Sequence, residues 1–303
     1  MNVSGPGSTR PFVDRPITDR DAALAAAEAA ATEWDLAPPE PWRTGMNAIF
    51  RSGDVVMRVG HTSAPPRAAL ELATFLTAHD VRVPRPHPVA PLTVGDLAVT
   101  AWERLEERDV PVQWEEVGAM VARLHSLDPA LLPPEYPLAD PRDLSWWKFD
   151  EMLVDTLADL DPDARAGLGR AVDRNSDWVG FGRGESVVCH GDVHPGNVMM
   201  ADDGVALLDW DLMCLAPPGW DHAPLLRWHE RWGGGAYYEP FAEGYGWSAR
   251  GDRFTESVAE LRLVAATLMR IRDAPTAPEA RAEAELRLRY WRGDPDAPPW
   301  TAR

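Results

Sequence analysis

The sequence predicts an α+β fold with two lobes: a small β-rich N-terminal lobe and a larger α-helical C-terminal lobe. Residues 36–102 alternate between two short β-type runs, a helical segment and a third β-type run. Beyond this region most apolar residues recur at helical spacing. The chain has 303 residues, which is long for one simple core but sufficient for two lobes. We therefore expect a flexible tail over residues 1–17, lobes over 18–104 and 105–303, and a hinge near 103–109.

Composition is typical of a globular protein and argues against several functions. Hydrophobic residues make up 45% of the chain and charged residues 26%. No membrane-spanning apolar run and no signal-peptide pattern are recognised, so we expect a cytoplasmic protein without a membrane partner. The net charge of -18 disfavours nucleic-acid binding and is compatible with a cationic small molecule, although acidic surfaces often serve solubility alone. Cys189 and Cys214 lack metal-ligand spacing and are expected to be free thiols.

A helix and a hairpin are predicted at the start of the N-terminal lobe. Thr18 fits the helix N-cap and Asp21 the third helical position, and an alanine-rich run continues to Trp34. A cluster of prolines then ends the helix. Two β-type runs, 48–51 and 55–59, flank a Ser-Gly-Asp turn, which predicts a hairpin.

A second helix and a third strand complete this lobe. The segment 65–79 begins with two prolines, which suit the first turn of a helix. Further prolines predict an extended connector over 84–91. The run 97–102 is again β-type and supplies the last strand.

The C-terminal lobe is predicted to be helical apart from one β segment. Apolar residues form a helical stripe over 114–127, and residues 144–174 and 220–292 also have mostly helical patterns. Between them, residues 187–189 read as a short buried strand. An Asp-Gly pair between two apolar runs in 198–208 predicts a hairpin.

The predicted hairpin brings oxygen-bearing side chains together at one end of its ladder. Its register places Asn197 opposite Leu208, the residue before Asp209. Asp192 lies on the loop that enters the ladder. A carboxylate and an amide suit a hard cation such as Mg²⁺, and a second carboxylate could accept a proton from a hydroxyl group.

The motif His190-Gly191-Asp192-x-x-x-x-Asn197, followed by Leu208-Asp209-Trp210-Asp211, resembles the aminoglycoside phosphotransferase family, which is related to choline, homoserine and macrolide kinases. The resemblance implies a protein-kinase-like fold with the catalytic hairpin in the C-terminal lobe. It also implies that Asp192 is the catalytic base and that Asn197 and Asp209 bind Mg²⁺. Asp221 matches a downstream aspartate of the family and is expected to brace the loop. Segments 71–86 and 119–127 match in order as well, so the resemblance covers most of the chain.

The resemblance further implies that ATP or GTP binds between the lobes. A G-x-G-x-x-G loop is missing, and the run that takes its place makes Gly45 and Asn47 the expected phosphate contacts. Arg58 stands where the family usually has a lysine, and the single lysine, Lys148, lies in the other lobe. Glu71 is the one carboxylate on the following helix, so we expect it to pair with Arg58, as lysine and glutamate do in kinases.

The predicted function is therefore transfer of the γ-phosphate of ATP or GTP to a hydroxyl of a small molecule, such as an aminoglycoside-type antibiotic or another cationic metabolite. One alternative is a catalytically silent kinase-like protein that binds a nucleotide or metabolite, although the intact Asp192, Asn197 and Asp209 argue against it. The other is a metal-dependent hydrolase with zinc on His190, Asp192 and His194, which would leave Asn197 and Asp209 unexplained.

Several side chains near the motif have two interpretations. His190 is expected to order the loop. His194 either faces solvent or contacts the phosphate or the acceptor. Four tryptophans either form a wall of the acceptor site or, as their helical spacing favours, belong to the core: Trp146, Trp147, Trp228 and Trp232.

Overall fold

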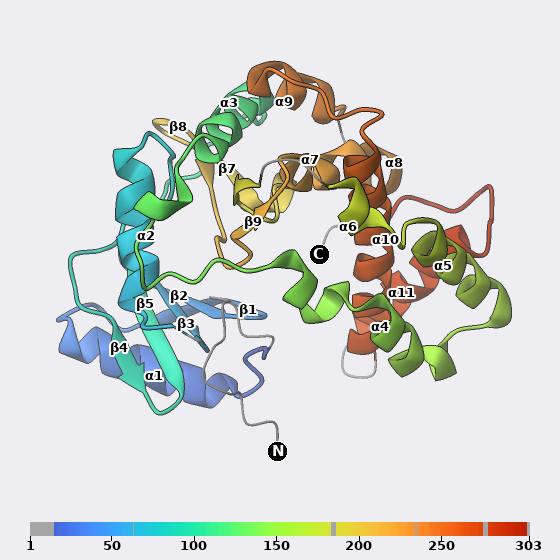
Figure 1. Ribbon diagram of the computed structural model, residues 1–303. Helices are drawn as coiled ribbons and strands as arrows, with labels where there is room; N and C mark the ends of the chain where they lie inside the picture. The colour runs from blue at the N-terminus through green and yellow to red at the C-terminus, as the bar shows by residue number, and fades with distance from the viewer. Residues whose placement is uncertain (1–14, 63, 183–185, 234, 275–277, 302–303) are drawn as a thin grey trace.

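The computed structural model describes residues 15–62, 64–182, 186–233, 235–274 and 278–301. An antiparallel sheet with one helix packed on its face forms the N-terminal lobe, and a mostly helical lobe follows (Figure 1). This arrangement confirms the α+β, two-lobed prediction. Among the described helices, none is both long and apolar enough to cross a membrane.

The N-terminal sheet has five strands in the order β1-β2-β3-β5-β4. Their bounds are β1 Glu40–Thr44, β2 Ala48–Ser52, β3 Val55–Gly60, β4 Leu92–Val94 and β5 Leu97–Glu103. The predicted hairpin is confirmed, because β2 and β3 pair in register with Phe50 opposite Met57. Burial alternates along β3, so Val56 and Arg58 share its less buried face, as the period of a strand requires.

Strands β1 and β4 were not predicted. Both lie at the edges of the sheet. Pro41 lies within β1, and proline is tolerated in an edge strand because one side of that strand needs no ladder hydrogen bonds. Strand β4 is only 3 residues long, too short to show an alternating pattern.

Helix α1 (Arg20–Glu33) packs on the sheet through five buried alanines, whose small side chains allow a close approach: Ala23, Ala26, Ala27, Ala30 and Ala31. The helix N-cap is Asp19, whose carboxylate accepts a hydrogen bond from the Ala22 N–H at 2.8 Å, and not Thr18 as predicted. The predicted tail is also too long. Residues 1–14 lie outside the described residues, but Ile17 is buried and its N–H donates to the Gly45 carbonyl.

Helix α2 (Arg67–Ala78) forms where the sequence predicts it. Its buried residues Ala68, Leu72 and Leu76 belong to the same apolar cluster as the helices of the C-terminal lobe. The helix therefore connects the two lobes, although it precedes β4 and β5 in the chain.

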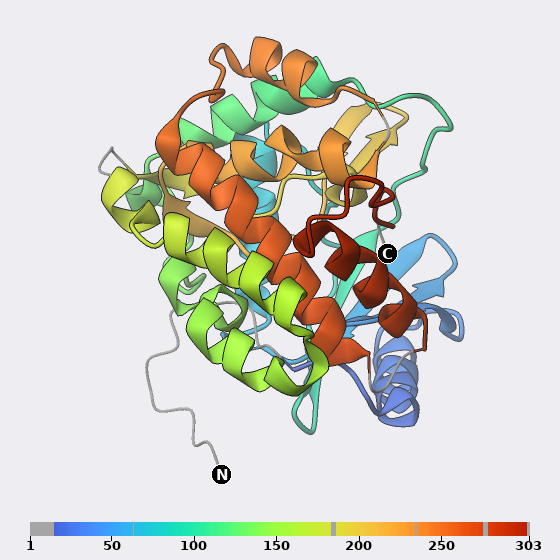
Figure 2. The ribbon, with the colours of Figure 1, turned by 90° about the vertical axis from the view of Figure 1, so that its right-hand side faces the viewer.

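The C-terminal lobe contains nine α-helices within the described residues: α3 Trp114–His125, α4 Phe149–Asp155, α5 Pro162–Arg174, α6 Trp178–Phe181, α7 Gly219–Leu226, α8 Trp228–Trp232, α9 Tyr238–Tyr245, α10 Arg253–Asp273 and α11 Pro278–Trp291. Short 3₁₀ turns join several of them. The longest, α10, crosses the lobe diagonally beside α5 and α11 (Figure 2). The helical character predicted for this lobe is confirmed.

Two small antiparallel ladders hold the motif residues. Strands β7 (Val198–Ala201) and β8 (Gly204–Leu207) form the predicted hairpin, and the Leu208 N–H donates to the Asn197 carbonyl at 2.9 Å. Strand β6 (Val187–Cys189) pairs with β9 (Cys214–Ala216), which was not predicted. The segment between β6 and β9 is therefore fixed at both ends, and it carries every motif residue of the catalytic region.

The chain crosses between the lobes just after β5. The Arg104 N–H donates to the Asp54 carbonyl in the N-terminal lobe, and the Arg108 N–H donates to the Met200 carbonyl in the C-terminal lobe. The lobe boundary predicted at residues 104 and 105 falls within this crossing and stays a prediction.

Candidate active site

A cavity of about 750 Å³ lies between the sheet and the C-terminal lobe. Its walls combine apolar side chains, among them Leu72, Leu76 and Trp102, with the polar groups of Arg58 and Asn197. A cavity of this size and mixed lining is typical of a small-molecule or cofactor site. The turn at residues 44–47 and the loop at 208–211 border the same cavity.

Asp221 braces the loop that carries the catalytic motif, as predicted. Its Oδ2 accepts from the His190 N–H at 2.7 Å, and its Oδ1 accepts from the Gly191 N–H at 2.8 Å. His125 Nε2 lies 3.0 Å from Oδ2. Burial opposes ionisation of this carboxyl, but the hydrogen bond from His125 and nearby charges lower the pKa of Asp221. The ionised Asp221 carboxylate thus fixes the loop by accepting hydrogen bonds from two backbone N–H groups.

Gly191 is required by the tight path of this loop. Its φ is +92°, and a Cβ there would lie 1.9 Å from the Leu212 carbonyl oxygen. Any other residue would push the loop away from the backbone of Leu212.

His190 orders the loop rather than offering a metal ligand. Its Nδ1 accepts from the Asp192 N–H at 3.2 Å, and its Nε2 lies 3.0 Å from the Leu208 carbonyl, to which it donates. Burial lowers the pKa of His190, which favours this neutral form. Because both ring nitrogens are occupied, the zinc site considered for His190, Asp192 and His194 is not formed.

Asp192 is held on both of its carboxylate oxygens. Arg262 Nη1 donates to Oδ1 at 3.0 Å, while Asn197 Nδ2 and His194 Nε2 each lie 3.3 Å from Oδ2. Burial favours the protonated acid, but the attraction of His194 and Arg262 outweighs it and lowers the pKa of Asp192. The carboxylate is therefore ionised and able to accept a hydrogen bond from a hydroxyl group.

Asn197 and Asp209 meet at the cavity, as the hairpin register predicts. The Asn197 Nδ2 donates to the Asp192 carbonyl at 3.0 Å, so its amide oxygen is the atom free to face a cation. Asp209 has a φ of +61°, and burial together with the nearby Asp211 raises its pKa to about 6. A buried carboxylate beside another one favours a bound cation, and this set of oxygen donors fits Mg²⁺.

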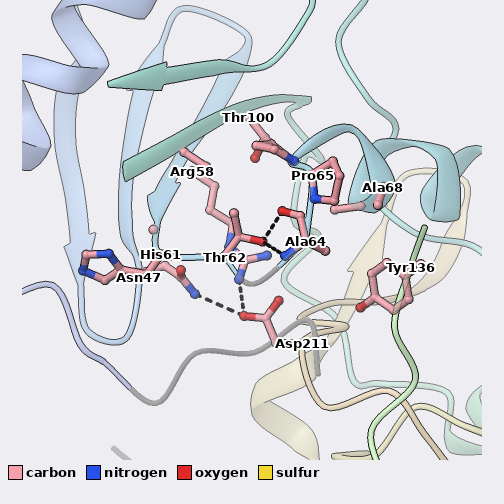
Figure 3. Close-up of a pocket in the computed structure, with 14 residues that line it drawn as sticks. Asn47, Arg58, His61, Thr62, Ala64, Pro65, Ala68, Thr100, Tyr136 and Asp211 are labelled. Atoms are coloured by element: carbon pink, nitrogen blue, oxygen red, sulfur yellow. Dashed lines mark hydrogen bonds and ion pairs between the residues drawn. The ribbon is translucent and has the colours of Figure 1, made fainter. Parts of the chain in front are cut away.

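Arg58 contacts Asp211 and not Glu71, which corrects the predicted pair. Its Nη2 binds Asp211 Oδ2, and Asn47 Nδ2 lies 3.3 Å from the same oxygen (Figure 3). Glu71 lies on the exposed side of α2. The reason is the helical phase: the buried stripe of α2 runs through Ala68 and Leu72, and Glu71 points away from it.

Asp211 is the residue of this group that the sequence did not single out. It comes two positions after Asp209, and this Asp-x-Asp spacing was the available signal. Gly45 and Asn47 line the same cavity as Asp211, and the turn between them is closed by the Gly45 N–H, which donates to the Asn47 carbonyl at 3.0 Å. A Cβ on Gly60 would lie 2.0 Å from Asn47 Oδ1, so a glycine there makes room for Asn47.

His194 is fixed by stacking and by its neighbours rather than facing solvent freely. Its Nδ1 accepts from the Gly196 N–H at 3.0 Å, and its ring stacks on Trp228 at 5.3 Å with an interplanar angle of 8°. Trp232 stacks on Trp228 in turn at 4.7 Å. Trp147 is buried among the aromatic rings of the core, so it forms no acceptor wall.

Comparisons with known proteins identify the family and the fold of this chain. The family model described as the phosphotransferase enzyme family matches residues 48–261. A spectinomycin phosphotransferase bound to AMP has 14% identity and a TM-score of 0.62, with 86% of this chain and 94% of that chain covered. A choline/ethanolamine kinase family protein from Mesorhizobium loti has 18% identity and a TM-score of 0.62, with 92% and 95% covered. No curated protein matches the sequence.

An aminoglycoside phosphotransferase from Streptomyces rimosus has 23% identity and a TM-score of 0.55, with 82% of this chain and 98% of that chain covered. At these identities the solved structures show the fold, which is the two-lobed kinase-like fold that the motifs imply. The family model spans more than half of the 303 residues and includes both motif segments. The chain therefore belongs to the phosphotransferase enzyme family.

Proposed function

We propose that this phosphotransferase moves the γ-phosphoryl group of ATP or GTP to a hydroxyl group of a small molecule. The observation that carries the proposal is that Asn197 and Asp209 line the interlobe cavity while the Asp192 carboxylate lies 3.3 Å from the Asn197 amide nitrogen. A base and two cation-binding oxygens are the parts that phosphoryl transfer to an alcohol needs.

The nucleotide binds in the cavity between the lobes. Apolar residues line the cavity and suit the nucleobase, among them Leu72, Leu76 and Trp102. Arg58 and the turn that contains Gly45 and Asn47 suit the phosphates. Solved relatives have been described in complex with AMP, with ADP, with AMP-PNP and Ca²⁺, and with GDP, which supports a nucleotide donor. Glu71 is exposed and has no part in this proposal.

Asn197 and Asp209 would hold Mg²⁺, which supplies charge neutralisation on the transferred phosphoryl group. Arg262 engages Oδ1 of Asp192 at 3.0 Å, whereas the contacts of Oδ2 with Asn197 and His194 are longer, at 3.3 Å, so we assign Oδ2 as the atom that faces the acceptor. There it orients the acceptor hydroxyl and takes its proton as the new P–O bond forms and the bond to the leaving nucleoside diphosphate breaks. The acceptor hydroxyl replaces the 3.3 Å contact of His194.

The acceptor is proposed to be a cationic alcohol. Solved relatives are described with spectinomycin, kanamycin and streptomycin, and one is of the choline/ethanolamine kinase family. The net charge of -18 gives this protein a field that attracts such cations. The hydrolase alternative loses its basis, because both nitrogens of His190 are engaged.

The test is a screen for phosphorylated products. The protein is incubated with MgATP or MgGTP and, in turn, spectinomycin, kanamycin, streptomycin, choline and ethanolamine, and products are identified by mass spectrometry. Asp192→Asn is the inactive control, and Glu71→Gln is the matched control that changes an exposed carboxylate away from the site. Nucleotide hydrolysis that needs no acceptor and survives Asp192→Asn would contradict the proposal.

A further inference from the structure

We propose that Arg262 is a positioning residue for the catalytic base: from helix α10 it holds the Asp192 carboxylate so that Oδ2 faces the acceptor. This inference rests on the proposed function. Arg262 is separated from Asp192 by 70 residues and lies outside both sequence motifs and just beyond residues 48–261, the segment that the family model matches.

The contact is made at two points on the same loop. Arg262 Nη1 donates to Asp192 Oδ1 at 3.0 Å, and Nη2 donates to the Gly191 carbonyl. One planar guanidinium thus binds both the side chain of the base and the backbone one residue before it. A fork of this kind fixes direction as well as distance, which a single ammonium group does not do.

Arg262 is itself held in place by packing against Trp220. Its guanidinium carbon lies 5.1 Å from the ring centroid of Trp220, which is 1% exposed, and the Arg262 side chain is 14% exposed. Trp220 precedes Asp221, the residue that braces the loop backbone. The loop is therefore held by Asp221 through its N–H groups and by Arg262 through a carbonyl and the carboxylate.

Stability alone does not account for an arginine at this position. Its Nε is buried and has no hydrogen-bond partner among the described residues. A buried N–H without a partner costs free energy, and buried ion pairs are often no more stabilising than apolar side chains of similar volume. The partly buried arginine is better explained by what it does to Asp192.

The orientation of the base is what this reaction demands. Phosphoryl transfer proceeds through a loose transition state in which positioning counts for more than the strength of the base. The two remaining contacts of Asp192, from Asn197 and His194, are both 3.3 Å long and both lie on Oδ2. Arg262 makes the only contact under 3.2 Å to the carboxylate among the described hydrogen bonds. Without it the carboxylate would be held by the two longer contacts on Oδ2 alone, and its orientation toward the acceptor would be less well fixed.

The experiment compares Arg262→Gln and Arg262→Lys with the parent protein. Turnover is measured as phosphate transfer from MgATP to whichever of the five screened compounds is phosphorylated, and as slow hydrolysis of MgATP, in which water takes the place of the acceptor hydroxyl. Calorimetry with MgAMP-PNP gives the nucleotide Kd, and thermal unfolding gives Tm. Arg174→Gln is the matched control, because it removes the ion pair between Arg174, which lies on α5 and is 52% exposed, and Glu260 on α10.

We expect Arg262→Gln to lower kcat about 100-fold while the MgAMP-PNP Kd changes by less than about threefold, since a misdirected group near the reacting atoms costs about this much. Arg262→Lys keeps the charge without the fork and should recover part of the loss, with kcat about tenfold below the parent. Arg174→Gln should leave kcat unchanged.

Parent-like kcat in Arg262→Gln, or a fall in kcat matched by an equal loss of nucleotide binding, would overturn the inference. If Arg262→Gln does not fold, Arg262→Lys decides: parent-like kcat refutes the fork, and a reduced kcat with unchanged Kd supports it. Asp192→Asn separates the two proposals. If it keeps full turnover the proposed function fails, and if it is inactive while Arg262→Gln is normal only this inference fails.

Discussion

The ion pair between Arg58 and Asp211 joins the lobes, and a double-mutant cycle would measure its strength. The two side chains belong to β3 and to the loop after β8, separated by 153 residues in sequence, and are 26% and 18% exposed. Two charges about 4 Å apart attract by about 4 kcal/mol at an effective dielectric constant of about 20. Desolvation offsets part of this, so we expect a coupling free energy of about 1–3 kcal/mol.

The assay is urea unfolding of the parent, Arg58→Ala, Asp211→Asn and the double variant. A second cycle with Arg58→Ala and Glu71→Gln is the control, and it should give a coupling below about 0.5 kcal/mol because Glu71 is exposed and does not contact Arg58. A coupling with Glu71 as large as that with Asp211 would refute the assignment of the pair. Arg58→Lys should also retain part of the phosphotransferase activity, whereas Arg58→Ala should lose most of it.

Four further predictions concern other groups. Asp192→Asn should lower turnover by about 10²- to 10⁴-fold in steady-state kinetics, and a change within about threefold would exclude it as the base. Asp209→Ala should remove the Mg²⁺ dependence of ATP binding measured by calorimetry, with little effect on folding, because the metal loses a carboxylate ligand; unchanged Mg²⁺ dependence would exclude it as a ligand. Burial lowers the pKa of His222 to about 4. Below about pH 6.5 the unfolded chain binds a proton at His222 that the folded protein does not bind, so the free energy of unfolding should fall by about 3 kcal/mol as pH drops from about 6.5 to 4. Unfolding of His222→Phe across this pH range should lack that decrease, and a pH profile identical to that of the parent would contradict this expectation. A cationic acceptor should bind more weakly as salt rises, and a confirmed neutral or anionic acceptor would overturn that expectation.

Local signals in the sequence were sufficient to locate both hairpins, because each has a glycine-containing segment between apolar runs. For the second hairpin the expected register puts Asn197 opposite Leu208. That register alone placed Asn197 next to Asp209, and the observed ladder agrees. Strand β9 was missed because its 3 residues form a strand only by pairing with β6. Long-range pairing of this kind leaves no local pattern.

The partners of Asp192 and Arg58 were missed for the same reason. Arg262 and Asp211 are 70 and 153 residues from the groups they contact, and an arginine within a helix is usually exposed. The mistaken pairing with Glu71 could have been avoided from the sequence alone. Leu72 and Leu76 define the buried stripe of α2, and Glu71 does not lie on it.

The position of Asp211 has a consequence for how the enzyme could be regulated. In protein kinases the carboxylate that pairs with the N-lobe cation lies on a mobile helix, and moving that helix switches activity on and off. In this protein the pairing carboxylate lies two residues from Asp209, on the loop proposed to bind the metal. Neither residue of the Arg58–Asp211 pair lies on α2. An effector that displaced this helix would therefore not break the ion pair. Control by an effector would instead have to reach the loop that carries Asp209 and Asp211.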